Sequence, residues 1–410
     1  MPNLIDTLLR PAITEGTLEI VDPDGHLHRL GEGAPHVTIA LKDRALPRRL
    51  ALNPKLVLGE AYMDGTLVIT GGTLSDLLEI AARNAARYEA GAAPQLAGKV
   101  DRMLRGARQF NPVRRAARNV RHHYDIDERL YDTFLDQTRQ YSCAYFRSGD
   151  ETLEEAQRAK MRHITAKLCL DHPGLSVLDI GCGWGGLAVY LAQETGAQVT
   201  GLTLSTGQFA GAEELANDAQ LADRVEIRLE DYRAATGRYE RIVSVGMLEH
   251  VGVRHYREYF NRIAELLADD GVALVHAIGR RGPPGAGNPW IRKHIFPGGY
   301  TPALSEVTSA IERSGLWVTD IEILRLHYAR TLACWFDRFQ TARDEVARAR
   351  GERFCRMWEF YLKGCEMAFR HMGQMVFQVQ LAHHPDAVPL TRDYVSTSEV
   401  RLDPLARQAA

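Results

Sequence analysis

The chain has 410 residues, of which 45% are hydrophobic and 25% are charged, and its formal net charge is −2. This length predicts more than one domain, and this composition is typical of an ordinary soluble globular protein. A net charge near zero argues against a protein that binds nucleic acid through its overall charge, so any attraction to a polyanion has to be local.

Six cysteines are scattered along the sequence without a paired or metal-like spacing. This spacing predicts free thiols in a reducing, cytoplasmic compartment. We expect neither a secretory signal nor a membrane-spanning helix, because no apolar run is long enough to cross a bilayer. Any contact with lipid is therefore expected at the membrane surface.

Residues 1–87 are predicted to form a small, separate α/β domain. Alternating polar and apolar residues over 16–21 and 36–41 predict two strands, and the Asp-Pro-Asp-Gly sequence at 22–25 predicts a turn. Apolar residues three and four positions apart over 74–85 predict an amphipathic helix. No group of residues in this domain has the pattern of a catalytic site.

Residues 88–121 are predicted to form a basic helical linker. Eight lysines and arginines lie between positions 99 and 121, against Asp101 as the single acidic residue. A basic amphipathic helix can bind an anionic bilayer, to which each basic residue contributes about 1 kcal/mol. The charge is equally consistent with a helix that docks on its own protein, and nucleic acid binding is the weakest of the three interpretations.

From about His122 to residue 410, strands and helices are predicted to alternate. This order is typical of a doubly wound, Rossmann-like α/β domain, which binds ligands at the carboxyl ends of its strands. A capping-box pattern at 152–155 predicts the start of a helix. Seven strands are predicted at 176–181, 198–204, 225–230, 241–247, 273–279, 317–326 and 375–381, the last of them antiparallel, and two late helices at 332–348 and 352–371.

A glycine-rich turn, Gly181-Cys182-Gly183-Trp184-Gly185-Gly186, follows the first predicted strand of this domain. Glycines lack the Cβ atoms that would keep a small ligand away from the backbone. The pattern also suits a dinucleotide, but the second strand ends in the hydroxyls of Thr203 and Ser205, where a nicotinamide site usually carries an acidic residue.

Asp179, just before the glycines, can accept hydrogen bonds through water from a ligand that bears an ammonium group. The turn therefore resembles the S-adenosylmethionine (SAM) site of Rossmann-like methyltransferases, with a purely structural glycine turn as the alternative.

Further SAM contacts are predicted on both sides of this turn. Asp231, at the end of the third strand, can accept the exocyclic amine of adenine or cap a helix. Gln208 is a candidate nucleoside contact, with an exposed helix position as its alternative. The predicted SAM site comprises Tyr141, Ser142, Asp179, Gly181, Gly183, Trp184, Thr203, Ser205, Gln208, Asp231 and Tyr232.

Ionisable residues follow the fourth and fifth strands. Glu249 could orient a cation or take up a proton, although alone it or His250 would more often be a capping or surface residue. His276 could hold an anion or move protons near neutral pH, with a hydrogen-bonded core histidine as the alternative. Cys143 has no base beside it in the sequence, so we expect no covalent role for its thiol. Residues 295–300 could form a lid.

Six motifs occur together in one order, at 141–143, 178–186, 199–205, 247–252, 295–299 and 327–332. This order resembles the cyclopropane-fatty-acyl-phospholipid synthases, including the mycolic acid cyclopropane synthases, firmly over 120–381. Residues 58–65 resemble part of the extra N-terminal domain of the phospholipid-acting branch, which implies that residues 1–87 associate with lipid.

The resemblance implies SAM as the methyl donor and a bound bicarbonate as the base. It implies a bicarbonate pocket made by Cys143, Glu249, His276, Ile278 and Tyr328, in which Cys143 and Ile278 contribute mainly backbone groups. The implied reaction transfers a methylene from SAM to the cis double bond of an unsaturated phospholipid acyl chain through a carbocation. Loss of a different proton from that cation would give methyl or methylene acyl chains instead.

Two alternatives from other classes are a catalytically silent SAM- or lipid-binding protein and a nicotinamide oxidoreductase. The intact set of five pocket residues argues against the first, and Thr203 argues against the second. The resemblance also implies a homodimer that works from the cytoplasm at the inner face of the membrane.

Overall fold

The computed structural model describes residues 7, 9–89 and 128–403, which divide into two compact units. Unit 1 holds the described residues up to 89 together with 285–297 and 332–374, and unit 2 holds 128–284, 298–331 and 375–403. Each unit has its own sheet and its own hydrophobic core.

Unit 1 is built on a four-stranded sheet in the order β2-β1-β3-β4. The strands are β1 (Glu15–Val21), β2 (Leu27–Leu30), β3 (Glu32–Leu41) and β4 (Leu67–Gly71). β1 and β3 run parallel, and the outer pairs are antiparallel. The two strands predicted in this part of the chain are confirmed as β1 and β3, whose alternate residues enter one core.

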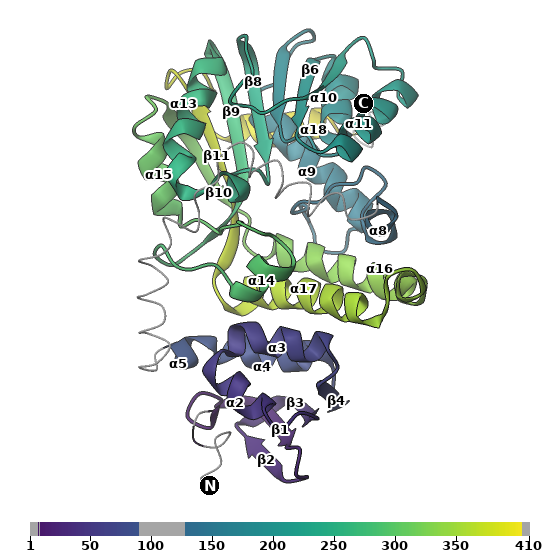
Figure 1. Cartoon of the computed structure of the whole chain (residues 1–410). Coiled ribbons are helices and arrows are strands. Elements are labelled where there is room, and N and C mark those ends of the chain that lie inside the picture. The colour runs from purple at the N-terminus through teal and green to yellow at the C-terminus, as the bar shows by residue number, and fades with distance from the viewer. Residues whose placement is uncertain (1–6, 8, 90–127, 404–410) are drawn as a thin grey trace. The chain divides into compact units, whose positions relative to one another are not determined.

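Helices α3 (Pro54–Met63) and α4 (Leu74–Arg83) pack against the strands of this sheet (Figure 1). Unit 1 also holds α2 (Leu46–Leu52), α5 (Ala85–Glu89), α14 (Pro289–His294), α17 (Glu352–His371) and the part of α16 (His327–Arg350) from residue 332 onward. The predicted amphipathic helix is α4. α17 packs against α3 and α4, so it belongs with the N-terminal residues although its sequence position had placed it in the second domain.

The predicted basic linker lies almost entirely outside the described residues, which resume at Glu128. Among the described residues, no helix combines the length and the hydrophobicity that crossing a bilayer would require.

Unit 2 contains a seven-stranded sheet in the order β10-β11-β9-β8-β5-β6-β7. The strands are β5 (Ser176–Ile180), β6 (Gln198–Thr203), β7 (Val225–Leu229), β8 (Tyr239–Val245), β9 (Leu267–Arg280), β10 (Trp317–Ile323) and β11 (Gln374–Ala382). Five neighbouring strands of the sheet, β9, β8, β5, β6 and β7, are parallel. β11 pairs antiparallel with β10, as predicted. The Rossmann-like prediction is therefore confirmed.

Two helical layers sandwich this sheet (Figure 1). α9 (Leu153–Lys167), α10 (Gly186–Thr195) and α11 (Thr206–Asp218) share one core with the sheet, and α13 (Tyr256–Leu266) and α15 (Leu304–Ile311) share the other. Unit 2 also holds α8 (Glu128–Phe134), α12 (Leu248–Val251) and α18 (Asp393–Arg401), the last packed on α9.

Local sequence explains where α9 begins. Thr152 accepts a hydrogen bond from the amide of Glu155, whose carboxylate accepts one from the amide of Thr152 in return. The predicted capping box is thus present, and it fixes the helix whose buried face supports the candidate site.

Candidate functional site

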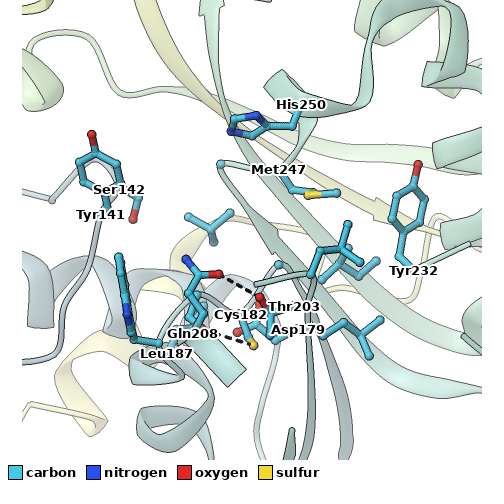
Figure 2. A pocket seen from close by; sticks show the side chains of 18 of the residues that line it. Tyr141, Ser142, Asp179, Cys182, Leu187, Thr203, Gln208, Tyr232, Met247 and His250 are labelled. Carbon is cyan, nitrogen blue, oxygen red and sulfur yellow. Dashed lines mark hydrogen bonds between the residues drawn. The ribbon is translucent and has the colours of Figure 1, made fainter. Parts of the chain in front are cut away.

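A pocket lies at the carboxyl ends of the parallel strands of unit 2. Its walls come from the turn after β5, the ends of β6 and β8, the residues after β7, and the segment 139–142 that precedes α9. The two strands β5 and β8 lie side by side at the point where the strand order reverses, which is where doubly wound sheets bind ligands. Figure 2 shows side chains from these segments converging on one space.

The glycine-rich turn shapes this pocket in two ways. Gly183 has a φ of +57°, and a Cβ there would meet no protein atom, so the turn leaves open space beside the pocket. Gly186 lies in a crowded place, where a Cβ would lie 2.3 Å from the carbonyl oxygen of Thr138. The second glycine therefore permits the segment 138–142 to approach the start of α10.

The amides of the turn are only partly available to a ligand. The backbone N–H groups of Gly181 and Cys182 both donate to the carbonyl oxygen of Leu202, at 3.0 and 2.9 Å. These bonds tie the turn to β6, so its first amides serve the fold, and a ligand has to use later groups of the turn or neighbouring side chains.

Asp179 is buried at the end of β5, and its Oδ2 atom has no hydrogen-bond partner among the described residues. Burial raises the pKa of Asp179 to about 7, and the positive charge of Lys160 limits that rise. A buried acceptor without a partner costs free energy unless a ligand satisfies it. This carboxylate is therefore suited to an ammonium group or to the water that bridges to one.

Thr203, Ser205 and Gln208 form one hydrogen-bonded cluster at the end of β6. The hydroxyl of Thr203 donates to Oε1 of Gln208 at 2.9 Å, and Oγ of Ser205 accepts from the amide of Gln208 at 3.2 Å. In Figure 2 the amide nitrogen of Gln208 points away from Thr203, which leaves it for a ligand. Ser205 caps α11 and does not line the pocket.

An aromatic wall closes one side of the pocket. Trp184 packs on Tyr131, with ring centroids 4.8 Å apart, and Tyr131 packs edge-on against Tyr141 at 5.3 Å. Tyr131 comes from α8, so this helix holds both pocket aromatics in place. The face of a purine ring or the methylene groups of a ligand would lie well against such a wall.

Most of the predicted SAM residues line this pocket: Tyr141, Ser142, Asp179, Gly181, Gly183, Trp184, Thr203, Gln208 and Tyr232. Asp231 does not, because its carboxylate pairs with Arg233 at 2.7 Å, and its neighbour Glu230 lines the pocket instead. A pair of adjacent acids after a strand gives no sequence signal for which of the two faces inward.

Met247 and His250 also line the pocket, although the sequence favoured a capping or surface position for His250. Burial lowers the pKa of His250 to about 4, so its imidazole is neutral near pH 7. A neutral ring beside the pocket does not repel a positively charged ligand.

Glu249 belongs to a second group of residues, around the end of β9. Its Oε1 accepts a hydrogen bond from the amide of Ile278 at 2.6 Å, and its backbone carbonyl accepts one from the amide of Tyr300 at 3.1 Å. Its Oε2 has no hydrogen-bond partner among the described residues. Burial raises the pKa of Glu249 to about 7, although the bond from Ile278 opposes the rise.

His276 lies two residues before Ile278 on β9, so the two side chains share one face of the sheet. Nε2 of Gln378, on β11, donates to Nδ1 of His276 at 3.2 Å, which leaves Nε2 of the imidazole to carry the proton. Burial and the charges of nearby cations lower the pKa of His276 to about 3. His276 is thus a neutral hydrogen-bond donor near pH 7.

Cys143 and Tyr328 are brought into one part of unit 2 by hydrogen bonds between their neighbours. The amide of Ala144 donates to the hydroxyl of Thr331 at 3.0 Å, and the amide of Phe146 donates to Nδ1 of His327 at 3.0 Å. These bonds fix the residues after Cys143 on the first turn of α16, which also carries Tyr328.

Burial raises the pKa of the Cys143 thiol far above its usual value. A neutral, buried thiol is a poor nucleophile, which agrees with the expectation that it has no covalent role.

A bicarbonate ion fits the chemistry of the β9 group. The protonated form of Glu249, which its raised pKa makes accessible near pH 7, and neutral His276 both offer hydrogen atoms to an anion, and the unpartnered Oε2 of Glu249 gives it a place to bind. SAM fits the first pocket, where Asp179 and the aromatic wall match its ammonium and its adenosine.

Comparisons with known proteins identify the family of this chain. The family model of the mycolic acid cyclopropane synthetases matches residues 112–379, and a domain family of unknown function matches residues 4–90. The chain is 36% identical to the cyclopropane-fatty-acyl-phospholipid synthase of Escherichia coli K12 over 88% of its own length and 94% of that protein. It is 34% identical to the tuberculostearic acid methyltransferase of Mycobacterium tuberculosis over 92% of its own length and 90% of that protein.

Solved structures give the same result. A mycolic acid cyclopropane synthase in complex with S-adenosylhomocysteine (SAH) and CTAB is similar with a TM-score of 0.61 and 32% sequence identity. The match covers 67% of this chain and 99% of that structure.

Proposed function

We propose, from the premise that this chain belongs to the mycolic acid cyclopropane synthetase family, that it adds a methylene group to the cis double bond of an unsaturated phospholipid acyl chain. Family membership makes it a SAM-dependent methyltransferase of the cyclopropane synthase type. The E. coli relative, which matches nearly the whole chain, supports a phospholipid as the substrate.

The SAM pocket residues have to hold the donor without opposing its positive charge. Asp179 and Gln208 offer polar contacts to its amino acid and nucleoside parts, and Tyr141 and Trp184 enclose it. Neutral His250 adds no positive charge next to the sulfonium. Bound SAM would supply an electrophilic methyl group, and a bound bicarbonate would supply the base that takes up the proton released on ring closure.

The proposal for the second site depends mainly on the carboxyl group of Glu249. Its Oε2 is shielded from solvent and lacks a partner, and its raised pKa lets it bind an anion as a hydrogen-bond donor. We propose that Glu249, His276 and the backbone of Ile278 hold bicarbonate, with Cys143 and Tyr328 completing the pocket. The unreactive thiol of Cys143 is important here, because a strong nucleophile would trap a cationic lipid intermediate.

The test is removal and restoration of bicarbonate. The full chain is incubated with SAM and vesicles of unsaturated phospholipid in a buffer freed of bicarbonate. We expect SAH release and cyclopropane formation to fall together and to recover when bicarbonate is added. Turnover that stays unchanged without bicarbonate would remove the ion from the proposal.

Glu249→Gln tests the residue itself. The amide can still donate a hydrogen bond to the bound ion but cannot exchange a proton with it, so we expect ring formation to fall at least about 100-fold, within the range of a lost acid–base group. SAH binding, measured by calorimetry, should stay within about twofold, because Glu249 does not line the SAM pocket. Near-full activity of this variant would exclude a chemical role for Glu249.

The second candidate function is the formation of methyl or methylene acyl chains in place of cyclopropane rings. The similarity to the tuberculostearic acid methyltransferase supports this alternative. A ring and a methylated alkene both add one CH2 to the acyl chain, so their masses do not distinguish them. NMR of the lipid product does, because cyclopropane protons resonate apart from those of a branched alkene or a methylene group.

We also propose that the protein acts as a homodimer at the cytoplasmic face of the membrane, where its acyl substrate lies. The charge of the basic segment 88–121, which falls almost wholly outside the described residues, supports the contact with the membrane, and the homodimer rests on the family resemblance. Binding to anionic vesicles should weaken as salt is added. Equal binding to neutral and anionic vesicles would point to a helix that docks on its own protein.

A further inference from the structure

Helix α9 directs two fully buried polar side chains at the segment that carries Tyr141 and Ser142. Nε2 of Gln157 donates to the carbonyl oxygens of Gln140 and Ser142, at 3.2 and 3.0 Å. Nζ of Lys160, one turn further along α9, donates to Oε1 of Gln140 and to Oγ of Ser142, the latter at 3.0 Å. One face of the helix thus binds both the backbone and the side chains of this part of the pocket wall.

Lys160 is an unusual residue for this position. It is completely buried, and the groups that accept its hydrogen bonds are neutral: an amide and a hydroxyl. Burying an ammonium group is costly, and a hydrophobic side chain would serve the surrounding core better. The stability of the fold therefore does not explain why a lysine occupies this position, and a functional role does.

The strand geometry places Lys160 on the same face of the sheet as Asp179. Val177, two residues before Asp179 on β5, packs in the core that α9 forms with the sheet, through Met161 and Ile164. Side chains two residues apart on a strand share a face, so Asp179 also points to the α9 side. Asp179 lines the same pocket as Gln140 and Ser142, and its Oδ2 has no hydrogen-bond partner among the described residues.

Lys160 also acts electrostatically on residues of both candidate sites. Its charge opposes the rise in the pKa of Asp179 and of Cys143, and it contributes to the lowered pKa of His276. Burial lowers the pKa of Lys160 itself to about 8, against the attraction of Asp136, Cys143 and Asp179.

We propose that Lys160 is a positioning residue of the methyl-donor site: it holds the 140–142 wall in place, and its positive charge favours the carboxylate form of Asp179 that receives the ammonium group of the donor. Gln157 shares the first task but not the second, because it carries no charge. This inference rests on SAM as the donor in the proposed function, and it concerns binding and not the ring-forming step.

The two tasks predict different pH dependence. Asp179 has to lose its proton to accept the donor, so affinity should rise as the pH increases through about 7. Without the charge of Lys160, the pKa of Asp179 should rise further, and the increase in affinity should move to higher pH. The other titratable groups facing this pair, Asp136, Cys143, Cys182 and His276, are the same in all variants compared.

The experiment measures SAH binding to the full chain by calorimetry from pH 6 to 9. For Lys160→Met we expect affinity at least tenfold weaker at pH 7.5 and a pH midpoint shifted upward by about one unit. Gln157→Leu is the matched control, which should weaken binding by a similar factor at every pH. Asp179→Asn should flatten the pH profile whether or not Lys160 is present.

The outcomes separate this inference from the proposed function. A Lys160→Met protein that binds SAH as the unmodified chain does, or one that loses affinity equally at all pH values, overturns the role of the charge. Failure of the unmodified chain to bind SAH would instead overturn the donor assignment. If Lys160→Met does not fold, Lys160→Gln keeps a hydrogen-bond donor without the charge and gives the same comparison.

Discussion

Two buried lysines of α9, Lys160 and Lys167, have opposite surroundings. Lys160 donates to neutral groups beside the pocket proposed to bind SAM, whereas Nζ of Lys167 lies 3.2 Å from Asp320 and 2.5 Å from Glu322 on β10. His163, between them on the helix, bridges Glu322 and Glu399 at 2.7 and 2.6 Å. One end of the helix forms ion pairs within the fold, although Nζ of Lys167 makes no well-aligned hydrogen bond among the described residues, and the other end lies beside the unpartnered Oδ2 of Asp179.

This difference distinguishes buried charges that hold the fold from those that serve a site. The paired end connects α9 to β10 and, through Glu399, to α18. At the site end, Asp179 and Glu249 each have a carboxylate oxygen without a partner among the described residues. An unsatisfied buried carboxylate lowers stability, so its presence indicates a functional constraint.

The largest effect on stability is expected from Glu322→Gln. This change removes the negative charge shared by His163 and Lys167 and leaves the buried lysine with a weaker partner. We expect the free energy of unfolding to fall by about 3 kcal/mol, as for other broken buried pairs. Urea unfolding measures the loss, and SAH affinity of the folded variant should stay unchanged.

The control for this prediction is Glu226→Gln, which breaks the exposed pair between Glu226 and Arg228. Exposed pairs contribute about 0–1 kcal/mol, so little change is expected. If Glu322→Gln were no more harmful than this control, the paired end of α9 would not hold the fold as described.

Much of this architecture follows from local sequence patterns. Period-two strands, the capping box at Thr152 and the glycine turn were enough to predict the Rossmann-like sheet and a pocket at the carboxyl ends of its strands. The polar face of α9 could not be predicted in the same way. Lys160, His163 and Lys167 would normally mark a solvent-exposed helix face, and only the packing of β5, β10 and α18 around α9 shows that they are buried.

Other differences also arise from tertiary structure. Asp231 was predicted in the pocket but pairs with Arg233, and Ser205 caps α11. α17 was assigned by sequence position to the second domain, but its apolar face packs on α3 and α4. A sequence gives the apolar face of a helix, and it does not give the surface that this face will meet.

A smaller effect, opposite in sign, is expected at the site end. Asp179→Asn removes a carboxylate whose ionisation is disfavoured by burial, so the free energy of unfolding at pH 8 should rise by about 1–2 kcal/mol. SAH affinity should fall at least tenfold in the same protein. Urea unfolding and calorimetry on one sample measure both quantities.

Asp136→Asn is the matched control for that change. Asp136 is also buried, but its carboxylate accepts hydrogen bonds from the amides of Thr138 and Gln140 and from the hydroxyl of Thr138. The same substitution should therefore destabilise the protein at this position. A loss of stability in Asp179→Asn as well would mean that Asp179 supports the fold and is not held for a ligand.

The smallest effect is the pH dependence of stability. Burial alone would lower the pKa of His163, but its hydrogen bonds to Glu322 and Glu399 hold it above the usual 6.5. Burial alone would raise the pKa of Glu322, but His163 and Lys167 hold it well below the usual 4.5. The histidine's contribution is complete below about pH 6.5 and is lost as the pH rises through its raised pKa, whereas the carboxylate's is lost only in acid.

Stability and SAH affinity should therefore respond to pH in opposite directions. Between pH 6 and 9 we expect the free energy of unfolding to fall by about 1 kcal/mol or more, while SAH affinity rises as Asp179 ionises. Repeating the unfolding series in a chain that carries both Asp179→Asn and Glu249→Gln removes the contributions of the two site carboxylates whose pKa is raised, so a remaining fall in stability can be assigned to the His163 cluster. A slope that disappears in this variant would place the whole pH response at the site, and the paired end of the helix would then be indifferent to pH in this range.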